Sequence, residues 1–195
     1  MIFKLKGKVI FFATNNIHKF HEARRVLDEY RMSVCMLRVK ALEIQSDSLE
    51  EIAKQSAIDS FKRCGLPLIV EDAGLFIDTL DGFPGPYAAY TYRTIGNRGL
   101  LKLMEKVEER TAIFRSVIAY HSSDLKSPKC FEGEALGKIT KKERRESNHS
   151  GFGFDPIFKP IRRDRTFAEM KSIQKNQVSH RAIALRKFAS WYQKL

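Results

Sequence analysis

The sequence predicts an α/β protein built around a mixed sheet with helices on its faces. Three observations support this fold. Short apolar runs alternate with segments of helical periodicity along the chain. The first apolar run, at residues 9–13, is followed directly by a polar turn and then a helical stripe. Finally, no repeat, low-complexity stretch or linker divides the 195 residues, so we expect a single domain over residues 1–195.

The elements of the first half follow from these patterns. Residues 9–13 (VIFFA) predict a buried strand, and a helix is expected after the polar residues 14–16. Ser48 and Glu51 match a capping box at the start of a second helix, which Gly65 and Pro67 end. Residues 68–70 (LIV) then predict a second buried strand, with an acidic turn at its carboxyl end.

The second half continues the same alternation. A turn is expected over residues 81–86 and a helix around residues 100–107. Residues 112–120 and 130–139 predict two strands that pair as a hairpin or meander. The charged run 141–146 (KKERRE) is typical of a solvated excursion. A final helix is expected to carry the apolar residues between 182 and 192.

Composition narrows the functional classes. The chain has 35 lysine and arginine residues against 23 aspartate and glutamate residues, a net charge of +12, and 43% hydrophobic residues, which excludes a disordered chain. No run reaches the about 18 apolar residues of a membrane span. Three widely spaced cysteines without metal-ligand spacing indicate reduced thiols and a cytoplasmic location. The positive charge favours polyanionic partners: nucleic acid, an anionic surface or nucleotide phosphates.

The first candidate group follows the first predicted strand. Thr14, Asn15 and Asn16 precede a helix that carries Lys19 one turn in. The backbone N–H groups and dipole at a helix start favour an anion, and a lysine adds a point charge. An ordinary N-cap with a surface lysine explains the segment about equally well. The chain has no P-loop and no dinucleotide-binding glycine motif.

The second candidate group is the acidic pair Glu71-Asp72. Carboxylates at a strand's carboxyl end lie where α/β proteins place ligands, and oxygen ligands suit Mg²⁺ with its phosphates. One of them could hold metal or deprotonate water. Glu43, in an apolar setting, could reach the same place. The alternative is a plain acidic turn, because Asp-x-Gly is common in loops.

The third candidate group lies between residues 149 and 181. Aromatic rings alternate with glycines in residues 151–156 (GFGFDP), which could expose a stacking face for a base. His180 and Arg181 offer donors to keto oxygens and phosphates. Taken singly, these segments are better explained as a buried strand turn and a helix start capped by Ser179.

Together these segments resemble the inosine/xanthosine triphosphate pyrophosphatase family, enzymes that remove non-standard purine nucleoside triphosphates. The match covers nearly the whole chain, and the order of many weak motifs makes it specific. The motifs are Thr14-x-Asn16-x-x-Lys19; Glu43-x-Gln45; Glu71-Asp72 before Gly74-Leu75; Gly82 and Pro84-Gly85; Phe131, Gly133, Gly137 and Ile139; Phe152-Gly153-Phe154-Asp155-Pro156; Thr166-Phe167-Ala168-Glu169-Met170; Lys175-Asn176; and Ser179-His180-Arg181.

The resemblance implies an elongated mixed sheet, two lobes with a central nucleotide cleft, and commonly a homodimer. It also implies a purine nucleoside triphosphate as substrate, Mg²⁺ as cofactor, and neither a membrane nor a specific nucleic acid as partner. Roles carried over are catalysis by Asp72 and Lys19 and metal binding by Glu43 and Asp72. The implied substrate-binding residues are Thr14, Asn15, Asn16, Lys19, Ala73, Phe152, Gly153, Phe154, Asp155, Lys175, His180 and Arg181.

The implied reaction is Mg²⁺-dependent hydrolysis between the α and β phosphorus atoms, with Asp72 taking the water's proton and Lys19 and Lys175 stabilising the departing pyrophosphate. The sequence departs from the family at four places, one of them the tolerable change to Phe154 where tyrosine or tryptophan is frequent. Ala73 stands where many members have serine, Ser56 where many have lysine, and residues 88–90 (AAY) where many read Ser-Ala-Arg. Lys54 could supply the missing cation. A basic nucleic-acid-binding module and a metal-dependent nuclease remain the alternatives.

Overall fold

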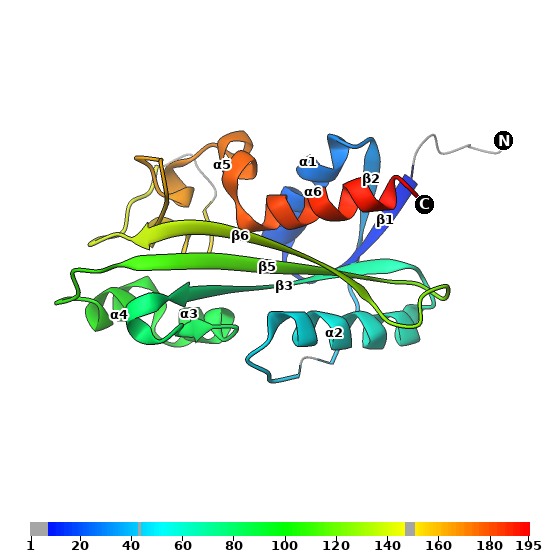
Figure 1. Cartoon of the computed structure of the whole chain (residues 1–195), viewed down its shortest axis with the longest axis horizontal. Helices are drawn as coiled ribbons and strands as arrows, with labels where there is room; N and C mark the ends of the chain where they lie inside the picture. Colours follow the sequence, from blue (N-terminus) through cyan, green and yellow to red (C-terminus); the bar gives the residue numbers. More distant parts are fainter. Residues whose placement is uncertain (1–7, 43, 147–150) are drawn as a thin grey trace. The chain divides into compact units, whose positions relative to one another are not determined.

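The computed structural model describes residues 8–42, 44–146 and 151–195 (Figure 1). Its strands form one mixed sheet in the order β2-β1-β3-β5-β6-β7, with β4 paired to β3. The α/β class and the mixed sheet are therefore confirmed. The strands are β1 (Lys8–Ala13), β2 (Met32–Leu37), β3 (Leu68–Ile77), β4 (Pro84–Gly85), β5 (Thr111–His121), β6 (Lys129–Ile139) and β7 (Phe158–Pro160).

Six α-helices and three short 3₁₀ helices lie in the described residues. The α-helices are α1 (Ile17–Asp28), α2 (Leu49–Cys64), α3 (Ala88–Thr94), α4 (Gly96–Leu103), α5 (Ser172–Val178) and α6 (His180–Tyr192), and the 3₁₀ helices are η1 (Asp78–Leu80), η2 (Asp155–Ile157) and η3 (Phe167–Glu169). None of these described helices is long and apolar enough to cross a membrane.

The chain forms two compact units. Unit 1 comprises Met1–Asp72, Val117–Glu132 and Ala184–Leu195, and unit 2 comprises Ala73–Ser116 and Gly133–Ile183. The chain passes between the units within β3, β5, β6 and α6.

Unit 1 is built on parallel strands. β1 pairs in parallel with β2 and with β3, and Figure 1 shows α1 and α2 on opposite sides of these strands. Phe12, Leu27 and Leu68 are fully buried in its core. The predicted strand at 9–13 and the helix that follows are confirmed. Strand β2 was not predicted, although its sequence MSVCML alternates in the period of a strand, because the run is only six residues long.

The caps of unit 1 explain where its helices begin and end. Ser48 caps α2, and its hydroxyl accepts the N–H of Glu51 at 3.3 Å. The predicted capping box is only half formed, because the Glu51 carboxylate accepts the hydroxyl of Ser46 at 2.6 Å instead. Gly65 ends α2 in the left-handed region at φ 66°, as a glycine after a helix commonly does.

Strand β3 differs from its predicted extent. The strand was expected to end at Val70, but it continues to Ile77 through Glu71 and Asp72. The apolar residues after the acidic pair extend the pairing, since Leu75 and Phe76 are matched with β4. Asp-x-Gly is therefore not a turn here, and the acidic pair lies in the middle of a strand.

Unit 2 has a separate aromatic core. Phe114 packs edge-on against Phe158 with ring centroids 4.6 Å apart, and Phe167 stacks at 5.9 Å. β6 pairs antiparallel with β7. Helix α3 was not predicted, and α4 ends at Leu103 rather than near residue 107. The predicted strands at 112–120 and 130–139 are confirmed as β5 and β6, which are neighbours in the sheet.

Candidate functional site

The first candidate group lies in unit 1, where β1 passes into α1. The Asn16 side-chain oxygen accepts the backbone N–H groups of His18 at 3.0 Å and Lys19 at 3.2 Å. The Thr14 hydroxyl in turn accepts the Asn16 N–H at 3.1 Å. The turn thus combines an ordinary N-cap with the predicted polar cluster. Asn15 is exposed beside it.

Lys19 binds a carboxylate within the same unit. Its ammonium lies 2.8 Å from Glu71 Oε2 and donates to the Glu71 carbonyl oxygen at 3.2 Å. The Glu71 side chain is fully buried, whereas that of Lys19 keeps 20% of its surface exposed. A buried carboxylate needs a paired cation, and the pair holds the lysine head at the sheet. Lys19 is therefore a fixed, partly accessible positive charge.

Asp72 points to the other face of the sheet. Successive side chains of a strand alternate between faces, so Glu71 faces α1 and Asp72 faces away from it. The Asp72 carboxylate has one oxygen, Oδ2, buried from solvent. One carboxylate of the pair was expected to hold metal or deprotonate water. Glu71 is paired with Lys19, and Asp72 on the opposite face remains the residue proposed for that role.

The predicted metal ligands can be examined only in part. Glu43 lies outside the residues that the structure describes. Among the described residues no group of three or more His, Cys, Asp or Glu side chains could hold a metal ion. Mg²⁺ commonly uses only one or two carboxylates and takes its other oxygens from substrate phosphates and water. The half-buried Asp72 carboxylate fits such a site.

Helix α2 does not present a cation at the position of the family lysine. The Ser56 hydroxyl donates to the Leu42 carbonyl oxygen at 3.4 Å. Lys54, which could have replaced that lysine, is paired with Glu50 at 2.5 Å one helical turn away. Both residues thus have local partners.

The third candidate group lies in unit 2. The Asp155 carboxylate accepts the Phe152 N–H at 2.9 Å and lies 2.6 Å from the Lys175 ammonium. Both side chains of this ion pair are only 4% exposed. The ammonium also lies 4.9 Å from the centroid of the Phe152 ring. Asp155 and Lys175 therefore fix the position of the half-buried Phe152 ring.

His180 and Arg181 begin α6 against the same aromatic residues. The His180 ring stacks on Phe114 with centroids 4.7 Å apart and planes at 9°. The Arg181 guanidinium lies 5.5 Å from the Phe152 centroid. Both residues are 3% exposed. Since Arg181 has only donors, its rigid fork beside an aromatic ring can recognise acceptor oxygens.

Phe154 and its glycine neighbours shape the loop that carries Phe152. Phe154 is 3% exposed and packs edge-on against Tyr92 at 5.5 Å, so its ring belongs to the core in this structure. Asn97 donates to the Gly153 carbonyl oxygen at 3.3 Å, and Gly153 has a positive φ of 59°. A Cβ at Gly151 would lie 2.5 Å from Ala168 Cβ, which explains the need for glycine there.

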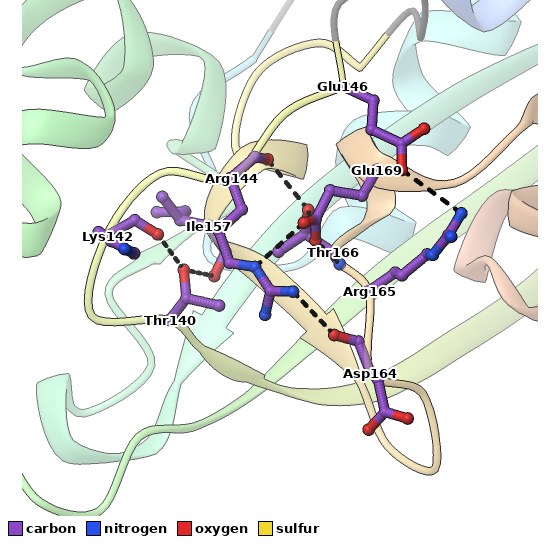
Figure 2. A network of polar contacts seen from close by, with 9 residues as sticks. All are labelled: Thr140, Lys142, Arg144, Glu146, Ile157, Asp164, Arg165, Thr166 and Glu169. Atoms are coloured by element: carbon purple, nitrogen blue, oxygen red, sulfur yellow. Dashed lines mark hydrogen bonds and ion pairs between the residues drawn. The ribbon is translucent and has the colours of Figure 1, made fainter.

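Arg144 was missed by sequence reasoning. The charged run 141–146 was predicted to be solvated, and most of it is exposed, but Arg144 is not. Figure 2 shows its guanidinium between Glu169 and the Asp164 carbonyl oxygen, both at 3.1 Å. Its carbonyl oxygen accepts the hydroxyl of the fully buried Thr166 at 3.1 Å. The pairing partner is distant in sequence, so composition alone could not reveal it.

Glu169 completes this network and predicts a pH dependence of stability. Its partial burial would raise its pKa, but hydrogen bonds from Thr166 and the charge of Arg144 outweigh this effect and lower the pKa. A carboxyl group whose pKa is lowered by folding stabilises the fold above its unfolded value, about 4.3, and this contribution is lost as pH falls through the folded value.

We therefore expect Glu169→Gln to lower the free energy of unfolding by about 1–2 kcal/mol at neutral pH. The difference from the parent protein should shrink below about pH 4. Urea unfolding at both pH values measures it, and Glu132→Gln, at an exposed position on β6, is the control. A constant difference at all pH values would contradict the role of the Glu169 charge.

These features define the class of the protein. It is a mixed α/β protein with a fixed lysine at a helix start in unit 1 and an aromatic, donor-lined group in unit 2, the chemistry needed for a phosphate chain and an aromatic base. The chain belongs to the Ham1 family, whose model matches residues 10–191.

Similar proteins extend over nearly the whole chain. A Methanopyrus kandleri protein named dITP/XTP pyrophosphatase is 48% identical over 94% of this chain and 96% of its own length. A Thermococcus kodakarensis protein of the same name is 46% identical over 92% and 95%. The solved structure of a HAM1 protein from Coxiella burnetii is 27% identical, with a TM-score of 0.83 over 96% of this chain and all of its own.

Proposed function

We propose that this protein hydrolyses non-standard purine nucleoside triphosphates, namely ITP, dITP and XTP, to the nucleoside monophosphate and pyrophosphate. The observation that carries this proposal is the near full-length similarity, at 48% identity, to a relative named dITP/XTP pyrophosphatase. The two residue groups supply the chemistry such a substrate requires. This activity would remove non-standard nucleotides from the nucleotide pool.

The group at the start of α1 is the proposed site for the phosphate chain. Lys19 offers a fixed cation whose head is partly accessible, and Thr14, Asn15 and Asn16 offer hydroxyl and amide groups beside it. Because Glu71 already neutralises part of the lysine charge, Lys19 can attract a phosphate without leaving an unpaired cation in its absence. Lys19 would then stabilise charge on the departing pyrophosphate.

Asp72 is the proposed base and a ligand of Mg²⁺ together with Glu43. When bound, Mg²⁺ would neutralise triphosphate charge and lower the pKa of the attacking water. The Asp72 carboxylate accepts that water's proton, and the Ala73 N–H that follows it is a potential donor to a phosphate oxygen. No nucleophilic side chain is needed, since water attacks the phosphorus directly.

The group in unit 2 is the proposed site for the base. The Phe152 ring would stack on the purine, while His180 and Arg181 donate to its keto oxygens. Asp155 and Gly153 hold the Phe152 loop, and Phe154 anchors that loop in the core. Lys175, expected along the nucleotide, is engaged with Asp155, so its proposed contribution is to position Phe152.

A nucleotide panel tests the proposal. We expect the purified protein to release pyrophosphate, and no orthophosphate, from ITP, dITP and XTP when Mg²⁺ is present. Chelation of the metal should abolish the reaction, because phosphate charge and water activation both depend on it. Coupled assays that detect pyrophosphate and orthophosphate separately distinguish the products. Orthophosphate release, or cleavage of a nucleic acid in place of nucleotides, would contradict the proposal.

The oligomer and the compartment are further parts of the proposal. A homodimer is supported by the aromatic residues that the α3 segment exposes, Tyr87, Tyr90 and Tyr92, since exposed apolar groups often mark contacts between chains. A cytoplasmic location is supported by the free thiols of Cys35, Cys64 and Cys130.

A further inference from the structure

A basic hollow lies in unit 2, on β6, β7 and the segments beside them. Its volume is about 340 Å³, and none of the residues proposed above to bind the nucleotide lines it. One carboxylate, Glu108, stands among six cationic side chains. The lining residues are Glu108, Arg110, Lys138, Ile139, Thr140, Lys141, Lys142, Arg144 and Lys159.

Two of the lysines are directly opposite each other on adjacent strands. Lys138 of β6 and Lys159 of β7 are direct register partners in an antiparallel pair. Side chains directly opposite each other are about 5 Å apart, where like charges destabilise the pairing. Among the described residues, Lys138, Lys141, Lys142 and Lys159 form no ion pair. The nearby Glu109 accepts the N–H of Thr111, and its pKa is lowered mainly by hydrogen bonds from Thr111 and further by the charge of Lys138, with which it forms no close ion pair.

Arg110 adds a buried charge to the wall of the hollow. It is 7% exposed, and its guanidinium donates to the carbonyl oxygens of Met104, Val107, Ile139 and Thr140 at 2.5–3.2 Å. These acceptors satisfy the donors but carry no full negative charge. Burial lowers the pKa of Arg110, and the charge of Glu108 in the same hollow partly opposes this effect. An anion in the hollow would add to this compensation.

The turn after β6 is held in a defined conformation. The Thr140 hydroxyl bonds the carbonyl oxygens of Lys142 at 2.7 Å and Ile157 at 3.2 Å, and Figure 2 shows these contacts. Arg144 is bound to Glu169, so its charge is already balanced. The backbone that carries Lys141 and Lys142 is therefore held in one conformation. Less backbone conformational entropy is then lost when an anion binds.

We propose that this hollow binds an oligophosphate chain, as free pyrophosphate or tripolyphosphate or as the phosphates of a nucleotide. Several phosphate groups match several lysines without ion pairs better than one phosphate would, and the volume admits more than one group. A bound anion would also reduce the electrostatic repulsion between the side chains of Lys138 and Lys159. This site is separate from the residues proposed for hydrolysis, and its test requires no activity.

Calorimetric titration with tripolyphosphate in the presence of a chelator tests the proposal. The background variant is Lys19→Ala, which removes the cation of the first group. In this background, Lys138→Gln with Lys142→Gln should weaken binding about tenfold, since two charges leave the hollow. Lys62→Gln with Lys126→Gln removes the same charge at exposed positions of unit 1 and should change the affinity less than about twofold.

A second measurement uses stability. Without ligand, Lys138→Gln should raise the melting temperature, because it removes the like-charge pair, and tripolyphosphate should stabilise the variant less than the parent. Equal affinity for tripolyphosphate and for ATP without Mg²⁺ would identify the phosphate chain as the ligand, and tighter ATP binding would identify a nucleotide. The proposal would be overturned if tripolyphosphate did not bind, or if both double variants lost the same affinity for it. Tighter binding of single-stranded DNA than of tripolyphosphate would also overturn it.

Discussion

Replacement of Asp72 by asparagine should lower kcat on ITP by at least about a hundredfold while the protein stays folded. Asparagine has nearly the same shape and keeps β3 intact, but it cannot accept the proton of the attacking water and binds a cation more weakly. Steady-state kinetics at saturating ITP and Mg²⁺ measure the effect, with circular dichroism to verify the fold.

Two further variants sharpen this result. Asp124→Asn makes the same chemical change in an exposed loop of unit 1 and should leave kcat unchanged. Glu43→Gln should mainly raise the Mg²⁺ concentration needed for half-maximal activity, because a ligand is weakened but the base remains. Near-normal turnover in Asp72→Asn would refute the assignment of the base. Failure of added Mg²⁺ to restore any activity in Glu43→Gln would refute its ligand role.

Selectivity among purine bases should be large. We expect kcat/KM for ITP and XTP to exceed that for GTP, with ATP lowest and up to about 10⁴-fold below ITP. Arg181 has only donors and is buried beside Phe152, so a base placed there needs an acceptor at position 6. The 6-keto oxygen of hypoxanthine and xanthine provides it, whereas the amino group of adenine would leave donors facing donors.

The matched variants for this prediction lie on the same helix. Arg181→Ala should narrow the ratio of ITP to ATP, because the donor that rejects adenine is gone. Arg186→Ala removes an arginine paired with Glu29 at 2.9 Å and should leave the ratio unchanged. Comparable kcat/KM values for ATP and ITP in the parent protein would show that Arg181 does not read position 6.

Local patterns predicted much of the fold because each reflects a local physical cause. The apolar run before Thr14 and the stripe after it define β1 and α1 without reference to any other segment. Strand β2 was not predicted because its alternation covers only six residues, and its position depends on pairing with β1. Tertiary pairing cannot be seen in a single window of sequence.

In the candidate site, too, local features could be predicted from the sequence and tertiary contacts could not. The cap by Asn16 follows from local chemistry. By contrast, the middle of a strand is an unusual place for Glu71, and the distant Lys19 forms an ion pair with it there. The binding of Arg144 to Glu169, 25 residues away, is likewise a product of the fold. Both contacts join segments that no spacing rule connects.

The passage of the chain between the two units has a consequence for its biosynthesis. Phe188, on α6, is fully buried in unit 1 and packs against Tyr120 and Phe131. Domains usually fold in order of synthesis, with the N-terminal one first. Here the N-terminal unit needs residues 184–195, which are synthesised after all of unit 2. Unit 1 therefore cannot complete its core until unit 2 has been made, and a premature stop before Ala184 would leave the earliest-made part of the protein unfinished.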